Sequence, residues 1–218
     1  MINYSILASG SSGNCTIIES EIMLDAGVPY KVLLPYIRTL RIVLLTHVHS
    51  DHFNKSTISA LARERPSLRF VCGEWLYDEL LKCGVFKFQV DRLYYHERAA
   101  YKSDSNGVSG CSIVMEQAVH DVPNAGYKIC LPSGERIFYM TDTSTLDGII
   151  AKNYDLYLIE NNYEDTEIQE RIDAKLAKGE FAYEYRVRRT HLSKQKCDEW
   201  LSRNKGDNSK IEYLHRHI

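Results

Sequence analysis

A cluster of potential metal ligands follows the apolar run Ile42–Leu45, which has the composition of a buried strand. The cluster consists of His47, His49, Asp51 and His52. Imidazole and carboxylate groups are ligands that divalent ions such as Zn²⁺ prefer. His47 and His49 would face one side and share an ion, while Asp51 and His52 would be free to hold a second. A solvated polar loop is the alternative, but four donors at this H-x-H-x-D-H spacing favour a metal site.

Three further donors also follow predicted strands. His120 follows the strand at 111–119, Asp142 follows 137–141, and His191 follows 185–190. Taken singly, each has an ordinary explanation as a capping aspartate or a surface histidine. Their common position at strand ends favours one shared site.

The pattern of these residues resembles that of the metallo-β-lactamase-fold hydrolases, and more closely the YycJ/WalJ-type branch. The matching segments are Ala8–Asn14, Leu24–Gly27, the H-x-H-x-D-H motif, Thr141–Thr143, Glu160–Asn162 and His191–Ser193. They extend over nearly the whole chain. The resemblance implies an α/β (α+β) protein with the αββα sandwich of that family.

The resemblance also implies a binuclear centre. One ion would be held by His47, His49 and His120, the other by Asp51, His52 and His191, with Asp142 between them. Two ions about 3.5 to 4 Å apart can share a hydroxide nucleophile and neutralise the oxyanion that forms. Asp51 would orient that hydroxide, and Asp25 would accept a hydrogen bond from a ligand imidazole, although an ordinary turn aspartate is equally compatible. Zn²⁺ is the expected ion, with Mn or Fe as alternatives.

Candidate substrate contacts come from three other segments. The small residues of the Ser9–Asn14 loop, which include Ser11, Ser12 and Asn14, would let backbone N–H groups approach an anion, although a plain hairpin turn also explains them. Arg186, Arg188 and Arg189 precede His191; strand alternation would place Arg186 and Arg188 on one side and Arg189 on the other, and at least one could face a phosphate. An exposed basic strand is the alternative.

The third segment departs from the branch pattern. Branch members commonly carry Asn-His-Asp where this chain reads Asn162-Tyr163-Glu164. Tyr163 could donate a hydrogen bond to substrate beside Asn162, but a phenol is a weaker acid than imidazole near neutral pH. This departure bears on substrate choice or rate and not on metal binding.

Composition agrees with a cytoplasmic enzyme. The chain has 218 residues, 44% of them hydrophobic, which suffices for a single domain spanning 1–218. The net charge of −2 gives no global attraction to nucleic acid, and no apolar run is long enough to cross a membrane. The N-terminus lacks the pattern of a signal peptide. Six scattered cysteines indicate free thiols, mostly in the core.

Hydrophobic periodicity predicts the secondary structure. Strands are expected at 2–8, 14–19, 21–25, 42–45, 68–71, 92–95, 111–119, 126–131, 136–141, 155–160, 185–190 and 211–217, helices at 30–39, 54–65, 74–82, 164–178 and 194–203, and polar loops at 102–109 and 203–210.

Three functions are compatible with these features. The resemblance favours a phosphodiesterase acting on nucleic acid, similar to an exonuclease. The alternatives are a phosphodiesterase for a small cyclic nucleotide and a non-catalytic metal-binding relative. The sequence does not determine the oligomeric state.

Overall fold

The computed structural model describes residues 1–101 and 110–215, which form two mixed six-stranded sheets. The first sheet has the order β1 (Tyr4–Ala8), β2 (Cys15–Ile18), β3 (Ile22–Leu24), β4 (Ile42–Leu44), β5 (Arg69–Gly73), β6 (Val90–Leu93). The second has the order β12 (Lys210–Leu214), β11 (Leu156–Glu160), β10 (Arg136–Met140), β9 (Asn124–Cys130), β8 (Ser112–Ala118), β7 (Arg98–Ala100).

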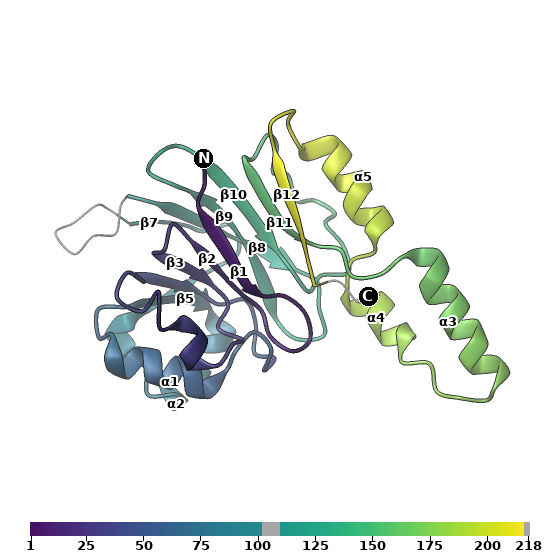
Figure 1. Cartoon of the computed structure of the whole chain (residues 1–218), viewed down its shortest axis with the longest axis horizontal. Helices are drawn as coiled ribbons and strands as arrows, with labels where there is room; N and C mark the ends of the chain where they lie inside the picture. The colour runs from purple at the N-terminus through teal and green to yellow at the C-terminus, as the bar shows by residue number, and fades with distance from the viewer. Residues whose placement is uncertain (102–109, 216–218) are drawn as a thin grey trace.

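Five α-helices accompany the sheets in this part of the chain. They are α1 (Lys55–Glu64), α2 (Tyr77–Lys82), α3 (Asp165–Ala177), α4 (Glu184–Thr190) and α5 (Lys194–Asn204). Figure 1 shows α1 and α2 beside the first sheet, α5 along β11 and β12, and α3 and α4 at the far end of the second sheet. None of the described helices has the length and apolar character needed to span a membrane.

Side-chain alternation along the strands separates the layers. On β10, Ile137 and Tyr139 pack between the sheets, whereas Phe138 and Met140 pack on the side of Trp200 in α5. Neighbouring side chains of a strand point to opposite faces, so strands buried on both faces need apolar residues at every position. The expected αββα sandwich is confirmed.

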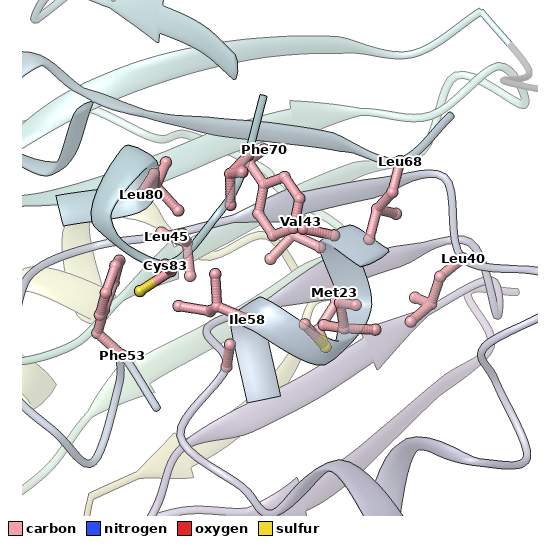
Figure 2. Close-up of a cluster of buried hydrophobic side chains, with 14 of the residues drawn as sticks. Met23, Leu40, Val43, Leu45, Phe53, Ile58, Leu68, Phe70, Leu80 and Cys83 are labelled. Carbon is pink, nitrogen blue, oxygen red and sulfur yellow. The ribbon is translucent and has the colours of Figure 1, made fainter. Parts of the chain in front are cut away.

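The core under the first pair of helices is shown in Figure 2. Val43, Leu45 and Phe70 of β5 lie on the face of the first sheet that meets Ile58 of α1 and Leu80 of α2. Asn54 caps α1 because its Oδ1 accepts a hydrogen bond from the Thr57 N–H at 3.1 Å. This packing fixes where the loop between β4 and α1 begins and ends.

Several predicted elements differ from the structure. The strand expected at 185–190 is helix α4, in which the buried residues Glu184 and Thr190 and the half-buried Val187 recur every three residues and so share one helical face. The helix expected at 30–39 is a 3₁₀ turn at Tyr30–Leu33 followed by further turns. The short strand β7 was not predicted. The last strand ends at Leu214, whereas it was expected to extend to residue 217. Residues 216–217 and the predicted polar loop at 102–109 lie outside the described residues.

The core packing leads to a first prediction. Phe70 is fully buried, so Phe70→Ala should lower the free energy of unfolding by about 3–5 kcal/mol, because it removes buried apolar surface and leaves a cavity. The control is Phe181→Ala, whose side chain is 87% exposed, and which should change that free energy by less than about 0.5 kcal/mol. Urea unfolding followed by circular dichroism measures both. Equal effects for the two variants would contradict the packing of Phe70.

Candidate metal centre

The potential ligands gather at one edge of the sandwich because of strand direction. β10, β11 and β12 are parallel, and β8 runs the same way because both β8 and β10 are antiparallel to β9. His120, Asp142 and His215 follow β8, β10 and β12, and Glu160 is the last residue of β11. The loop after β4 brings the remaining donors from the facing sheet.

Close backbone contacts hold that loop in place. The N–H groups of His52 and Phe53 both donate to the His49 carbonyl, at 2.9 and 2.7 Å, which makes a tight turn. The Asn14 N–H donates to the Asp51 carbonyl at 2.6 Å. A Cβ on Gly27 would lie 1.7 Å from the Asp51 oxygen, so only glycine allows this approach.

The first group of donors is His47, His49 and His120. His120 Nε2 lies 3.4 Å from His49 Nδ1, and the centroids of the His47 and His120 rings are 5.1 Å apart. His120 Nδ1 is 2.8 Å from the Thr190 carbonyl oxygen, which leaves Nε2 for the centre. Burial, reinforced by the charge of His52, lowers the pKa of His47 well below its usual value, so this imidazole is neutral, as a ligand must be.

The second group is completed by His215, where the resemblance implied His191. Asp51, His52 and His215 form this group. His52 Nε2 lies 3.4 Å from Asp51 Oδ2, and His215 Nε2 lies 3.7 Å from the same oxygen. Asp142 lies against both imidazoles: its Oδ2 is 2.9 Å from His52 Nε2, and its Oδ1 is 3.6 Å from His215 Nε2. Asp142 also forms a group with His47 and His52, so it adjoins both sets of donors.

Asp25 is the buried acceptor that orients His52. Its Oδ2 lies 2.7 Å from His52 Nδ1 and accepts a hydrogen bond of 2.7 Å from the Tyr139 hydroxyl. Its Oδ1 accepts from the N–H and the hydroxyl of Thr46, both at 2.9 Å. Burial lowers the pKa of His52, but Asp142 and Asp25 outweigh it and raise that pKa well above its usual value. The carboxylates on either side of His52 therefore favour a positive charge there, which a divalent ion at Nε2 would supply in place of the proton.

His191 is held by a different carboxylate. Its Nδ1 lies 2.6 Å from Glu160 Oε1, and 3.5 Å from Asp142 Oδ1. Glu160 is fully buried, and its Oε2 accepts hydrogen bonds from the N–H groups of Thr143 at 2.9 Å and Leu192 at 3.2 Å. Burial also lowers the pKa of His191, with Asp142 opposing that shift. Asp142, Glu160, His191 and His215 form a further group of close donors.

Glu160, His215 and Asp121 were missed by the sequence reasoning. Glu160 directly follows four hydrophobic residues of β11, and His215 directly follows β12, so both share the strand-end signal used for His120 and Asp142. Asp121 Oδ1 lies 3.1 Å from His120 Nε2 and 3.5 Å from His49 Nε2. The position of Asp121 next to His120 in the sequence could have indicated its place at the site.

A cavity of about 250 Å³ opens over these donors. Ser11 and Arg186 line it, together with His49, His120, His191 and His215. Arg186 pairs with Asp121, at 2.5 Å between Nη2 and Oδ2. A ligand at the centre would therefore meet both imidazole and guanidinium groups.

The other predicted substrate contacts lie elsewhere. Arg188 donates to Gln169 Oε1 of α3 at 2.9 Å, and Arg189 lies beside Phe181 and Tyr185 in a neighbouring pocket that Arg186 also lines. Arg186 and Arg189 thus share a face, contrary to the predicted alternation, because three residues make nearly one turn of helix α4. Ser12 is exposed and does not line the cavity.

The side-chain amides of Asn14 and Asn162 contact the proposed ligand residues. Asn14 Nδ2 lies 2.8 Å from His52 Nε2 and 3.2 Å from Asp51 Oδ2. Asn162 Nδ2 donates to the His215 carbonyl at 3.0 Å and lies 2.9 Å from His215 Nδ1. Tyr163 lines a separate pocket between α3 and α4, and burial raises its pKa to about 12, so it is a neutral phenol.

Backbone strain and an unsatisfied atom mark the same place. Asp25, Asp142 and His215 have φ values of 56°, 53° and 52°, a left-handed conformation that costs non-glycine residues free energy and is found at functional sites. Within the described residues, the buried His47 Nε2 has no hydrogen-bond partner. The nitrogen and carboxylate donors, with this free imidazole nitrogen, fit divalent ions of the zinc type.

Comparison with known proteins gives a match to a family model and matches to related curated sequences. The model of the beta-lactamase superfamily domain matches residues 22–207. Exodeoxyribonuclease WalJ of Streptococcus pneumoniae serotype 2 (strain D39) is 28% identical over 228 residues, which cover 97% of this chain and 80% of the relative. This similarity agrees with the branch resemblance noted in the sequence.

Solved structures share the fold at low identity. The metallo-beta-lactamase fold protein YhfI from Bacillus subtilis matches with a TM-score of 0.71 at 14% identity. The match covers 100% of this chain and 87% of the YhfI chain. The short form of human tRNase Z matches with a TM-score of 0.67 at 13% identity. The match covers 99% of this chain and 92% of the tRNase Z chain.

The family model spans most of the chain, from β3 into the loop after α5. The two facing sheets and their flanking helices agree with the fold of this family. The chain therefore belongs to the beta-lactamase superfamily and is a hydrolase of the metallo-β-lactamase fold.

Proposed function

We propose that this protein is a metal-dependent phosphodiesterase that acts on nucleic acid, with DNA as its first candidate substrate. The main support is the similarity to an exodeoxyribonuclease over 97% of the chain, combined with a dense set of metal donors under an open cavity. The tRNase Z fold match adds the precedent that this fold serves nucleases. Arg186 at the cavity wall offers a group suited to a phosphate oxygen.

We infer that two divalent ions bind, with Zn²⁺ expected. His47, His49 and His120 would hold one, and Asp51, His52 and His215 the other, with Asp142 contacting both. Bound ions of this kind supply an activated water and neutralise charge on the phosphoryl group. Asp51 is placed to orient the attacking water, because its carboxylate lies at the cavity surface beside His215.

His191 has a separate role in this proposal. Its ring lines the cavity, and Glu160 engages Nδ1, which leaves Nε2 to carry a proton toward the leaving oxygen. Glu160 fixes the ring through a buried carboxylate that two backbone N–H groups also hold. This arrangement of a carboxyl group behind an imidazole fixes the orientation of the ring, while burial lowers the pKa of His191 and so makes its proton easier to give up.

The two histidines should respond differently to mutation. His215→Ala should reduce bound metal from two ions per chain to about one, because it removes a donor of the second group. His191→Ala should keep two ions and lower kcat by about 10²–10⁴-fold, as expected for loss of a proton donor. Elemental analysis and turnover of purified protein measure these outcomes. If His191→Ala loses an ion while His215→Ala keeps both, the ligand set implied by the resemblance is right and the present assignment is wrong.

Asp25 provides a test of the buried network. Asp25→Asn should weaken metal affinity by about 10–100-fold, because it removes the charged acceptor behind His52. The matched control is Asp173→Asn on the exposed side of α3, which should leave affinity unchanged. Titration of metal-stripped protein against a competing chelator measures both variants. An unchanged affinity in Asp25→Asn would show that His52 is not a ligand.

The substrate class can be tested with a panel. Metal-loaded protein should hydrolyse single- or double-stranded DNA, and its apparent affinity for DNA should fall steeply with salt because several phosphates are contacted. A cyclic nucleotide, RNA and bis(p-nitrophenyl) phosphate complete the panel. Faster turnover of the cyclic nucleotide with a shallow salt dependence would favour the small-molecule alternative. No hydrolysis of any phosphodiester by the metal-loaded protein would refute the proposal.

A further inference from the structure

A second cavity, of about 150 Å³, lies between α3 and α4 and adjoins the metal cavity. The two cavities share Tyr183 and Val187 as a common wall. Figure 1 shows α3 and α4 next to each other at one end of the second sheet. A molecule that reaches across this wall could occupy both cavities at once.

Two residues that line the second cavity each have a buried side-chain oxygen atom that lacks a hydrogen-bond partner in the described part of the chain. These atoms are Asn162 Oδ1 and Glu184 Oε2, on side chains whose residues are 2% and 3% exposed. The rest of each side chain is engaged: Asn162 Nδ2 donates to the His215 carbonyl at 3.0 Å, and Glu184 Oε1 lies 2.7 Å from Lys175 Nζ. Because the His215 carbonyl only accepts, the amide of Asn162 must keep its oxygen on the other side. Buried acceptors without donors are costly, so a ligand whose N–H groups reach these oxygens after a small shift of the two side chains would be favoured.

The walls of this cavity suit a flat ring. Tyr163 and Tyr183 contribute aromatic rings, and Ile168 and Val187 contribute apolar surface. Aromatic side chains offer faces on which a planar ring can stack. The volume resembles that of a cavity that accepts a single benzene ring, so a compact planar group fits and a bulky one does not.

The charges around this cavity nearly cancel. Three carboxylates line it, on Glu164, Glu167 and Glu184. Each has a basic neighbour: Lys194 at 3.2 Å, Arg171 at 3.9 Å and Lys175 at 2.7 Å. The lining is therefore close to neutral and rich in acceptors, which favours an uncharged occupant with hydrogen-bond donors.

From these observations we propose that the cavity between α3 and α4 is a subsite for a nucleobase that carries an exocyclic amino group. The base would belong to a nucleotide next to the phosphodiester held at the metal cavity, so this inference rests on the proposed function. Cytosine, adenine and guanine each present an amino group, which is a donor to a carboxylate or amide oxygen. Thymine has no exocyclic amino group, and its one ring N–H lies between two carbonyl oxygens, which would face Glu184 and Asn162 unfavourably.

Nucleosides without phosphate test the subsite separately from the metal centre. Binding of deoxycytidine, deoxyadenosine, deoxyguanosine and thymidine to metal-loaded protein is measured by ligand-observed NMR. At least one amino-bearing nucleoside should bind about 10-fold more tightly than thymidine, the effect expected for a hydrogen bond to a charged acceptor. This comparison uses the wild-type protein, so it does not depend on the folding of a variant. Equal affinity for all four nucleosides, or binding of none, would overturn the proposal.

Glu184→Gln tests the acceptor directly. The glutamine keeps a carbonyl for Lys175 but can place an amide donor where Oε2 lies, so affinity for the preferred nucleoside should fall about 10-fold and the preference over thymidine should narrow. Glu170→Gln, an exposed change on the same helix as Glu167, is the control and should alter neither. Unchanged affinity in folded, metal-loaded Glu184→Gln would contradict the assigned role of Glu184.

Hydrolysis of bis(p-nitrophenyl) phosphate by the wild-type protein separates the two proposals. If this base-free diester is cleaved while nucleosides bind without preference, the phosphodiesterase stands and the base subsite fails. If nucleosides bind with the expected preference while no phosphodiester is cleaved, the cavity binds bases but the proposed function is wrong.

Discussion

The structure depends on keeping several imidazole and carboxylate groups close together in a buried place. Charges removed from water are costly unless opposite charges or hydrogen bonds compensate them. Here each buried group is compensated in part: His52 lies between Asp25 and Asp142, and Glu160 accepts from His191 and two backbone N–H groups. The centre is therefore an arrangement of opposed charges that the surrounding sheets must hold in register, and divalent ions would complete it.

That requirement explains the contacts that connect the two sheets. Asp25, after β3, joins Tyr139 of β10 to Thr46 and His52 after β4, so one carboxylate sets the position of a ligand loop relative to the opposite sheet. The glycine-serine loop acts similarly, since Ser9 Oγ accepts from the His215 N–H at 2.7 Å. In this way the loop after β1 is coupled to a donor more than 200 residues later in the chain. Shifts between the sheets would separate the proposed donors.

The sequence predicted the sandwich and much of the donor set because both depend on short patterns. Apolar strands that end in histidine or aspartate are visible without any knowledge of distant contacts, as at His47 and Asp142. Helix α4 was mistaken for a strand because the order of its charged and uncharged residues resembles the period of two that strands show. The burial of Glu184 and Thr190, which marks the inner face of the helix, depends on packing against other elements. The grouping of His215 with Asp51 was also out of reach, because it follows from the parallel pairing of β11 and β12 and from loop contacts that no local pattern records.

The most direct test of the proposed centre is the anomalous X-ray scattering of zinc in crystals of the metal-loaded protein. We expect two anomalous peaks, one surrounded by His47, His49 and His120 and the other by Asp51, His52 and His215, with Asp142 in contact with both. A single peak, or a second peak bound by His191 in place of His215, would contradict this arrangement.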